Sequence, residues 1–179
     1  MKTESVLEKV FATGELAVTG ECGPPRGALP DVVKNKAAML KGYVDAVNVT
    51  DNQTAMVRMS SFAASVFLRQ MDLHPVFQMV TRDRNRLAMQ SDILGAYSHG
   101  INTMLCLSGD HTQFGDHAMA ANVHDLDSVQ LIQTVRECEM KVGSREGRKS
   151  RTHLKCLSVR PPTPLPIRLN CGLPGWPKK

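Results

Sequence analysis

The sequence lacks a long hydrophobic run and a secretory leader. None of its apolar stretches reaches the roughly 18 residues that a membrane-spanning helix needs. The chain begins M-K-T-E-S-V-L-E-K-V-F, in which charged and apolar residues alternate, whereas a secretory signal carries an unbroken apolar segment. We therefore expect a cytoplasmic protein.

The cysteines form no recognisable framework. Their number is odd and no two have C-x-x-C spacing; they are Cys22, Cys106, Cys138, Cys156 and Cys171. Neither a disulfide framework nor a zinc knuckle is indicated, so we expect reduced thiols. His111, His117 and His124 are six and seven residues apart. This spacing fits no standard zinc-ligand arrangement, and we expect no metal.

Aromatic residues are scarce, at 4% of the chain. The arginine-rich stretch T-R-D-R-N-R, residues 81–86, has no aromatic neighbour to stack on nucleic-acid bases. We therefore expect no nucleic-acid partner and interpret the stretch as a solvated or phosphate-facing loop.

Acidic residues are nearly missing from the last part of the chain. Residues 141–179 carry 10 Lys and Arg against one acidic residue, whereas residues 1–140 carry 12 against 16. Six of the ten prolines also follow residue 140, and no helical or strand period is present there. We expect a folded domain over 1–140 and a disordered, basic, Pro-rich tail over 141–179.

Strand-like apolar runs recur along residues 1–140. The expected strands cover 16–20, 46–50, 75–79 and 103–107. The expected helices cover 4–12, 31–40, 60–71, 83–100 or 85–100, and 127–138. The strand period of about 28–30 residues is the length of one strand, one helix and their connections. In the helix at 31–40, Asp31 is the expected cap, and Val32, Val33, Lys36 and Met39 or Leu40 are expected to face inward. Four βα units predict half of a (β/α)8 barrel.

Polar residues follow the expected strands at their carboxyl ends, where parallel β/α proteins place their chemistry. They are Glu21, Thr50, Asp51, Gln78, Ser108, Gly109 and Asp110. Loops are polar in general, so each position alone is weak, but a match at four successive units indicates a site. Glu21, beside a Gly-Pro-Pro turn and partly screened from water, is the candidate acid because such a carboxyl group can hold a raised pKa.

Several motifs resemble those of the methylenetetrahydrofolate reductase family. They are E-x-x-P-P-R (21–26), V-x-V-T (47–50) and L-C-L-S-G-D-H (105–111), with further similar runs over 78–97 and 125–132. The likeness covers roughly residues 16–138. It implies an FAD-dependent enzyme with the α/β fold of a (β/α)8 TIM barrel, which reduces 5,10-methylenetetrahydrofolate to 5-methyltetrahydrofolate with NADH or NADPH as hydride donor. It also implies a folate substrate, and a homo-oligomer or partner subunit in full-length relatives. The absence of a long apolar run gives the further expectation of no membrane partner.

The same resemblance implies roles for individual residues. Glu21 matches the family's general acid, which protonates N10 of the folate, and Asp110 matches the aspartate near the flavin and the pterin. The implied flavin contacts are Thr50, Gln78, Leu107, Ser108, Gly109, Asp110 and His124. Relatives commonly have a histidine and a tyrosine where this chain has Gln78 and His124. They also often have aromatic residues around the acid, where this chain has Gly20, Cys22 and Gly23.

The chain departs from the family after about residue 140, where the second four βα units of relatives do not follow. Codons can be chosen for residues 160–179 that, read two bases later, encode A-A-N-P-F-A-D-P-F-E-L-R-V-T-R-L-A-K-K, which resembles the family's next segment. We therefore expect a frameshift between about residues 140 and 150, which the nucleotide sequence of the gene tests. A nonfunctional barrel fragment and a flavin-free, pterin-binding methyltransferase barrel are the alternative interpretations.

Overall fold

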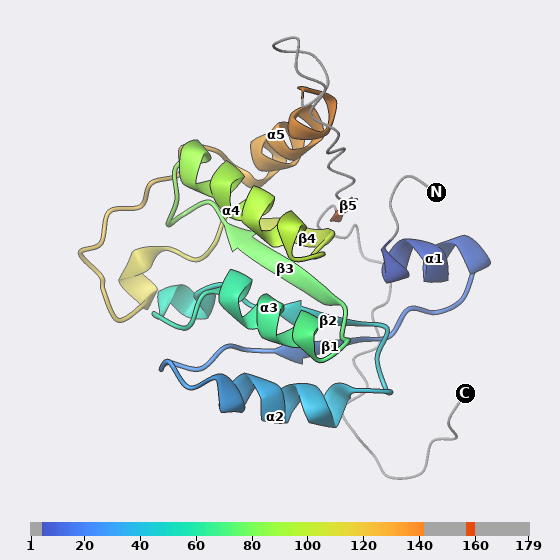
Figure 1. Ribbon diagram of the computed structural model, residues 1–179. Coiled ribbons are helices and arrows are strands. Elements are labelled where there is room, and N and C mark those ends of the chain that lie inside the picture. Colours follow the sequence, from blue (N-terminus) through green and yellow to red (C-terminus); the bar gives the residue numbers. More distant parts are fainter. Residues whose placement is uncertain (1–4, 142–156, 160–179) are drawn as a thin grey trace.

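The computed structural model describes residues 5–141 and 157–159. They form one parallel sheet with the strand order β1-β2-β3-β4-β5. The strands are β1 (Thr19–Cys22), β2 (Ala46–Val49), β3 (Pro75–Val80), β4 (Thr103–Leu107) and β5 (Leu157–Val159). The helices are α1 (Val6–Thr13), α2 (Pro30–Leu40), α3 (Ser61–Gln70), α4 (Arg86–Ser98) and α5 (Ser128–Lys141), with short 3-10 turns η1 (Gln53–Ala55) and η2 (Thr112–Phe114). A helix follows each of the first four strands, so the four predicted βα units are present (Figure 1).

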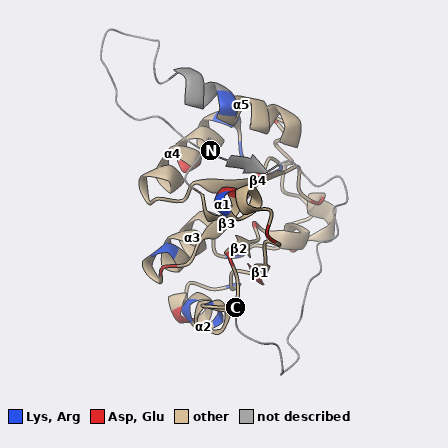
Figure 2. Ribbon diagram, turned by 90° about the vertical axis from the view of Figure 1, so that its right-hand side faces the viewer, with Lys and Arg blue, Asp and Glu red and all other residues tan. Residues whose placement is uncertain are grey.

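The two faces of the sheet are covered differently. Side chains alternate between the faces along each strand, and α2, α3 and α4 cover one face (Figures 1 and 2). Strand residues on that face pack in two apolar clusters: Cys22, Val47 and Val49 with Val33, Ala37, Ala64 and Leu68, and Phe77, Met79, Met104 and Cys106 with Met89, Ile93, Leu131 and Val135. The opposite face, here called the inner face, carries the alternate positions, among them Glu21, Asn48, Gln78 and Leu105.

Helix α1 covers the amino-terminal part of the inner face. The Ser5 hydroxyl oxygen caps the helix by accepting a hydrogen bond from the Glu8 N–H at 3.2 Å, and Gly14 ends the helix with a φ of 76°. Leu7 is buried with Ala46 and Val76. In Figure 2, α1 lies in front of the strands, on the side where they begin. The carboxyl ends of the strands are therefore left to the loops that follow them.

Helix α2 differs from its prediction in both its cap and its buried side. Leu29 stands at the cap position, Pro30 opens the helix, and Asp31 lies in the first turn. Val33 and Ala37 are buried, whereas Met39 is 70% exposed. Two apolar stripes one residue apart are both compatible with the sequence of this helix, and only packing against the sheet decides between them.

Strand β1 begins later than the sequence predicts. It covers Thr19–Cys22, and its register pairs Glu21 with Asn48 of β2. Leu16 and Val18 precede the strand and are exposed. Glu21 therefore lies inside the strand rather than in the following loop. Apolar character alone placed the strand too early, because the pairing with β2 sets its bounds.

A fifth strand falls where the sequence analysis expects no strand periodicity. Leu157–Val159 runs parallel to β4, with Thr103 opposite Leu157 and Leu105 opposite Val159. Three residues are too few to show an alternating pattern, so sequence periodicity misses this strand. The rest of the predicted tail, 142–156 and 160–179, lies outside the described residues. Within the described part of the chain, no helix is both long and apolar enough to cross a membrane.

An exposed ion pair joins the start of α4 to the segment before α5. The Asp125 carboxylate accepts hydrogen bonds from the Arg86 N–H (2.8 Å), Nε (2.9 Å) and Nη2 (2.9 Å). These hydrogen bonds from Arg86 lower the pKa of Asp125 to about 2. The folded-state pKa therefore lies below the ordinary value near 4.

Asp125→Asn is expected to destabilise the protein at neutral pH and to lose that effect in acid. A carboxyl group with a lowered folded-state pKa stabilises the fold above its ordinary pKa, and this contribution disappears as the pH falls from about 4 towards about 2. Thermal unfolding should show a lower Tm than wild type at pH 7 and convergence as the pH approaches 2. The control Asp31→Asn removes an exposed carboxylate that lies 4.0 Å from Lys34, and its Tm should stay near wild type. A constant Tm difference at all pH values would contradict the assignment.

Candidate functional site

The loop after β1 is held rigidly although its two prolines have no N–H groups. Three successive carbonyl oxygens each accept a hydrogen bond: Gly23 from Lys36 Nζ (2.8 Å), Pro24 from Arg58 Nη1 (3.1 Å) and Pro25 from the Met59 N–H (2.9 Å). Arg26 then forms an ion pair with Asp116 in the loop after β4, at 3.0 Å. The E-x-x-P-P-R motif is thus tied to α2, to the β2–α3 loop and to the loop after β4.

Glu21 points from β1 to the inner face and is exposed. The expectation that it is partly screened from water is therefore wrong for the described residues, because β1 is the edge strand of their sheet. An open hollow of about 430 Å³ lies beside it, lined by Glu21, Gly23, Lys36, Met39, Leu40, Gln53 and Arg58. A substrate group therefore has space next to this carboxyl group.

The side chain of Thr50 and the main chain of Gly109 show whether the carboxyl ends of the strands suit a bound ligand. Thr50 is 6% exposed, and its buried hydroxyl has no hydrogen-bond partner among the described residues. Gly109 has a φ of 87°, and a Cβ at this position would lie 3.1 Å from the Cβ of Val80. A buried hydroxyl without a partner costs free energy unless a ligand supplies one. The Thr50 hydroxyl therefore fits a bound polar group such as a flavin, and Gly109 lets the main chain after β4 pack closely against Val80.

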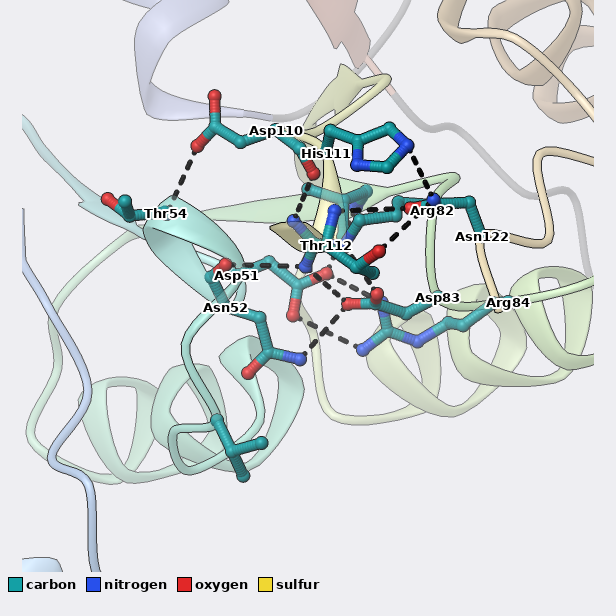
Figure 3. A network of polar contacts seen from close by, with 12 residues as sticks. Asp51, Asn52, Thr54, Arg82, Asp83, Arg84, Asp110, His111, Thr112 and Asn122 are labelled. Carbon is teal, nitrogen blue, oxygen red and sulfur yellow. Dashed lines mark hydrogen bonds and ion pairs between the residues drawn. The ribbon is translucent and has the colours of Figure 1, made fainter. Parts of the chain in front are cut away.

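Asp110 follows β4 and is exposed, with its main chain and side chain held by different residues (Figure 3). Its carboxylate accepts a hydrogen bond from the Thr54 N–H at 3.1 Å. Its carbonyl oxygen accepts another from Arg82 Nη1 at 2.8 Å. The direction of the carboxylate therefore depends on the β2–α3 loop as well as on β4.

The remaining predicted flavin contacts lie around the same strand ends. Gln78 is half-buried inside β3, two residues before the strand ends, so it is not a loop residue. Leu107 is the last residue of β4, and Ser108 is exposed directly after it. His124 is exposed with a φ of 40°, and the N–H of the preceding residue donates to the Arg82 carbonyl at 2.7 Å. The structure thus brings together Thr50, Leu107–Asp110 and His124 at the carboxyl ends of the strands, around the end of β3.

The arginine-rich stretch is only in part the solvated loop that the sequence analysis expects, because Arg86 is exposed whereas Arg82 and Arg84 are held in ion pairs. Arg82 is 2% exposed, and its guanidinium contacts Asp83, Asn52 and Asp110. Burial alone would raise the pKa of Asp83, but hydrogen bonds from Arg82 and Asn52 outweigh it, so the pKa is lowered. The buried contacts of Arg82 were missed because its partners lie in loops about 30 residues away in both directions.

Arg84 forms a second buried pair, with Asp51. Its Nη1 and Nη2 donate to the two Asp51 carboxylate oxygens at 2.6 and 3.2 Å, and the Asp51 side chain is fully buried. Burial alone would lower the pKa of Arg84, but the hydrogen bond and charge of Asp51 outweigh it, so the pKa is raised. The Val80 N–H donates to the same carboxylate at 3.0 Å. Asp51 therefore joins the ends of β2 and β3 and is not a site-facing group.

Sequence reasoning overlooked Asn48 as a residue of the site and left the role of His111 open. Asn48 pairs in register with Glu21 on the inner face, and its amide donates to the Thr19 hydroxyl oxygen at 3.4 Å. Alternation within V-N-V-T would have indicated its direction. His111 caps η2 by accepting from the Gln113 N–H at 3.2 Å. Within the described residues, no group of three or more His, Cys, Asp or Glu side chains is arranged to hold a metal ion.

Comparison with known proteins identifies one related family. The family model described as methylenetetrahydrofolate reductase matches residues 6–145. This range contains all four βα units and every residue of the candidate site. No curated protein matches the chain.

Proposed function

Because this chain belongs to the methylenetetrahydrofolate reductase family, we propose that it binds FAD at the carboxyl ends of β2, β3 and β4 and reduces 5,10-methylenetetrahydrofolate to 5-methyltetrahydrofolate. The observation that carries the proposal is the set of residues at one edge of a parallel sheet: Glu21, Thr50, Ser108, Gly109 and Asp110. FAD bound there supplies hydride transfer from NADH or NADPH to the methylene carbon. We place the activity in the cytoplasm.

Glu21 is the proposed proton donor. Protonation of folate N10 opens the five-membered ring and leaves positive charge at the methylene carbon, which general acid catalysis by a positioned carboxyl group promotes. The hollow beside Glu21, lined also by residues of α2 and of the β2–α3 loop, gives a substrate group space next to this residue. Asn48, the register neighbour of Glu21, presents an amide that can hydrogen-bond the pterin.

Asp110 is the proposed electrostatic partner of the substrate. Its carboxylate lies at the end of β4, and β2 and β3 separate it from Glu21 in the sheet. Three strand spacings amount to roughly 14 Å along a flat sheet. An extended ligand therefore suits the site better than a small one. A fixed negative charge there favours the positive charge that develops on the folate.

A binding experiment with matched variants tests the proposal. FAD is titrated into the purified chain, followed by flavin fluorescence, and folate reduction is then measured with NADH and with NADPH. We expect saturable FAD binding by wild type, weaker binding by Gly109→Ala because of its positive φ and close Val80 contact, and unchanged binding by Gly27→Ala, whose Cβ meets open space.

Three results would contradict the proposal or favour an alternative. Absence of FAD binding by the folded wild-type chain would overturn the flavin assignment. Binding of 5-methyltetrahydrofolate without any flavin would favour the methyltransferase-type barrel. Binding of FAD without turnover would favour a fragment that holds the cofactor but is not an enzyme by itself.

A further inference from the structure

Arg82 is buried at the centre of three loops that follow β2, β3 and β4 (Figure 3). Its guanidinium donates to Asp83 from Nε (2.6 Å) and Nη2 (2.7 Å), to the Asp110 carbonyl from Nη1 (2.8 Å) and to the Asn52 carbonyl from Nη2 (3.3 Å). Its main-chain N–H also donates to the Ser108 carbonyl at 3.2 Å. One residue therefore contacts all three loops.

The charge of Arg82 is already balanced inside the protein. Asp83 accepts two hydrogen bonds from the guanidinium and a third from Asn52 Nδ2 at 3.1 Å. The paired charges cancel at a distance, so Arg82 has little long-range influence on a ligand. Its contribution is the planar geometry of its donors, which a lysine side chain does not reproduce.

Arg82 acts on Asp110 from two sides. Directly, it binds the Asp110 carbonyl. Indirectly, it binds the carbonyl of Asn52, at the start of the loop whose Thr54 N–H holds the Asp110 carboxylate. The backbone and the carboxylate of Asp110 thus depend on the same guanidinium.

The loop that carries Thr54 needs such an anchor. Asn52, Thr54 and Ala55 have φ values of 41°, 59° and 56°, a region that residues other than glycine rarely adopt. Each such residue is strained and persists when the surrounding contacts hold it. Without the hydrogen bond from Arg82 to the Asn52 carbonyl, the strained conformation of the loop is less stabilised, and the Thr54 N–H is held less firmly toward Asp110.

We propose that Arg82 is a positioning residue that sets the direction of the Asp110 carboxylate by holding both Asp110 and the loop of Thr54. The inference rests on the proposed function for its catalytic consequence, because Asp110 is there the electrostatic partner of the folate. The structural part is independent of any ligand, and it is tested without one.

Arg82→Lys tests the structural part in the ligand-free protein. Amide hydrogen exchange of Thr54 should become about tenfold faster, as expected for the loss of one net hydrogen bond. The amide of Ile93 in the core of α4 reports global stability and should change less than that of Thr54. Arg86→Lys, the same substitution at an exposed arginine of the same stretch, should leave Thr54 exchange unchanged. Equal Thr54 exchange in wild type and Arg82→Lys would overturn the proposal.

Steady-state kinetics test the catalytic part. Arg82→Lys should lower kcat for folate reduction by about tenfold to a hundredfold, the scale of a misplaced catalytic group, with a much smaller change in KM and in FAD affinity. An equal loss in Asp110→Asn and in the double variant would confirm that both residues act through one carboxylate. Additive losses would overturn it. Failure of wild type to bind FAD would refute the proposed function while leaving the exchange result valid.

If Arg82→Lys does not fold, Asn52→Gly provides a second variant. Glycine adopts the positive φ of residue 52 without strain and keeps the carbonyl that Arg82 binds. Thr54 exchange in Asn52→Gly should stay close to that of wild type. Faster exchange in this variant would mean that the Asn52 side chain, and not Arg82, holds the loop, and would overturn the proposal.

Discussion

Glu21→Gln is expected to lower the rate of 5,10-methylenetetrahydrofolate reduction by a factor of about 10² to 10⁴, the usual contribution of a general acid. Glutamine keeps the size and hydrogen-bonding ability of the side chain but has no proton to give to folate N10. Glu21 lies in β1, and its carboxylate takes no part in the hydrogen bonds that hold the following loop, which come from Lys36, Arg58 and Met59. The fold should therefore survive the substitution. Stopped-flow kinetics of the folate-dependent step measure the effect.

Two comparisons make this result specific. Glu15→Gln changes an exposed glutamate ahead of β1 and should leave the rate unchanged. FAD affinity of Glu21→Gln should match wild type, because the proposed flavin contacts lie at the carboxyl ends of β2, β3 and β4 and in the loops that follow them, and not on β1. Folate reduction by Glu21→Gln at the wild-type rate would assign the proton donor to another residue. Loss of FAD binding together with the rate would show a role in holding the site.

The succession of elements was predictable because the signals for it are local. Ser5, Ser60 and Asn85 each stand before an apolar helical pattern, and each caps its helix. The buried strands β2, β3 and β4 read as short apolar runs. The predicted ends of an element were wrong where pairing with a segment distant in the sequence sets them. Only the pairing of Thr19 with Ala46 shows that β1 starts three residues later than the start of the predicted strand at residue 16.

The residues of the candidate site could be predicted from the sequence, but the hydrogen bonds and ion pairs that hold them in place could not. Glu21, Thr50 and Asp110 come from motifs that follow strands, and topology brings parallel strand ends to one edge. Arg26 and Asp116, in contrast, are 90 residues apart, and Arg82 and Asp110 are 28 apart. Nothing in a local stretch tells a buried arginine from a solvated one, since both appear as charge among polar residues. The contacts that direct the carboxylates therefore required the structure.

Asp51 and Arg84 form the most deeply buried ion pair among the described residues. The Asp51 side chain is fully buried and the Arg84 side chain is 16% exposed. Asp51 accepts hydrogen bonds from Arg84 and from the Val80 N–H. Its buried negative charge is therefore stabilised by hydrogen bonds as well as by the positive charge of Arg84. Arg84 also reaches Asp92 on α4 at 3.2 Å. Removing the arginine would leave a carboxylate without a countercharge in the interior.

Arg84→Met is therefore expected to lower the free energy of unfolding by about 3–5 kcal/mol, the cost of breaking a buried pair by removing one partner. Denaturant unfolding followed by circular dichroism measures it. The double variant Asp51→Asn/Arg84→Met should recover most of the loss. The asparagine side chain that replaces Asp51 is neutral, and its oxygen can still accept the hydrogen bond from the Val80 N–H. Asp92→Asn leaves the buried pair intact and should have a far smaller effect. If the double variant is as unstable as the single one, the loss comes from packing around Arg84 and not from the unpaired charge of Asp51.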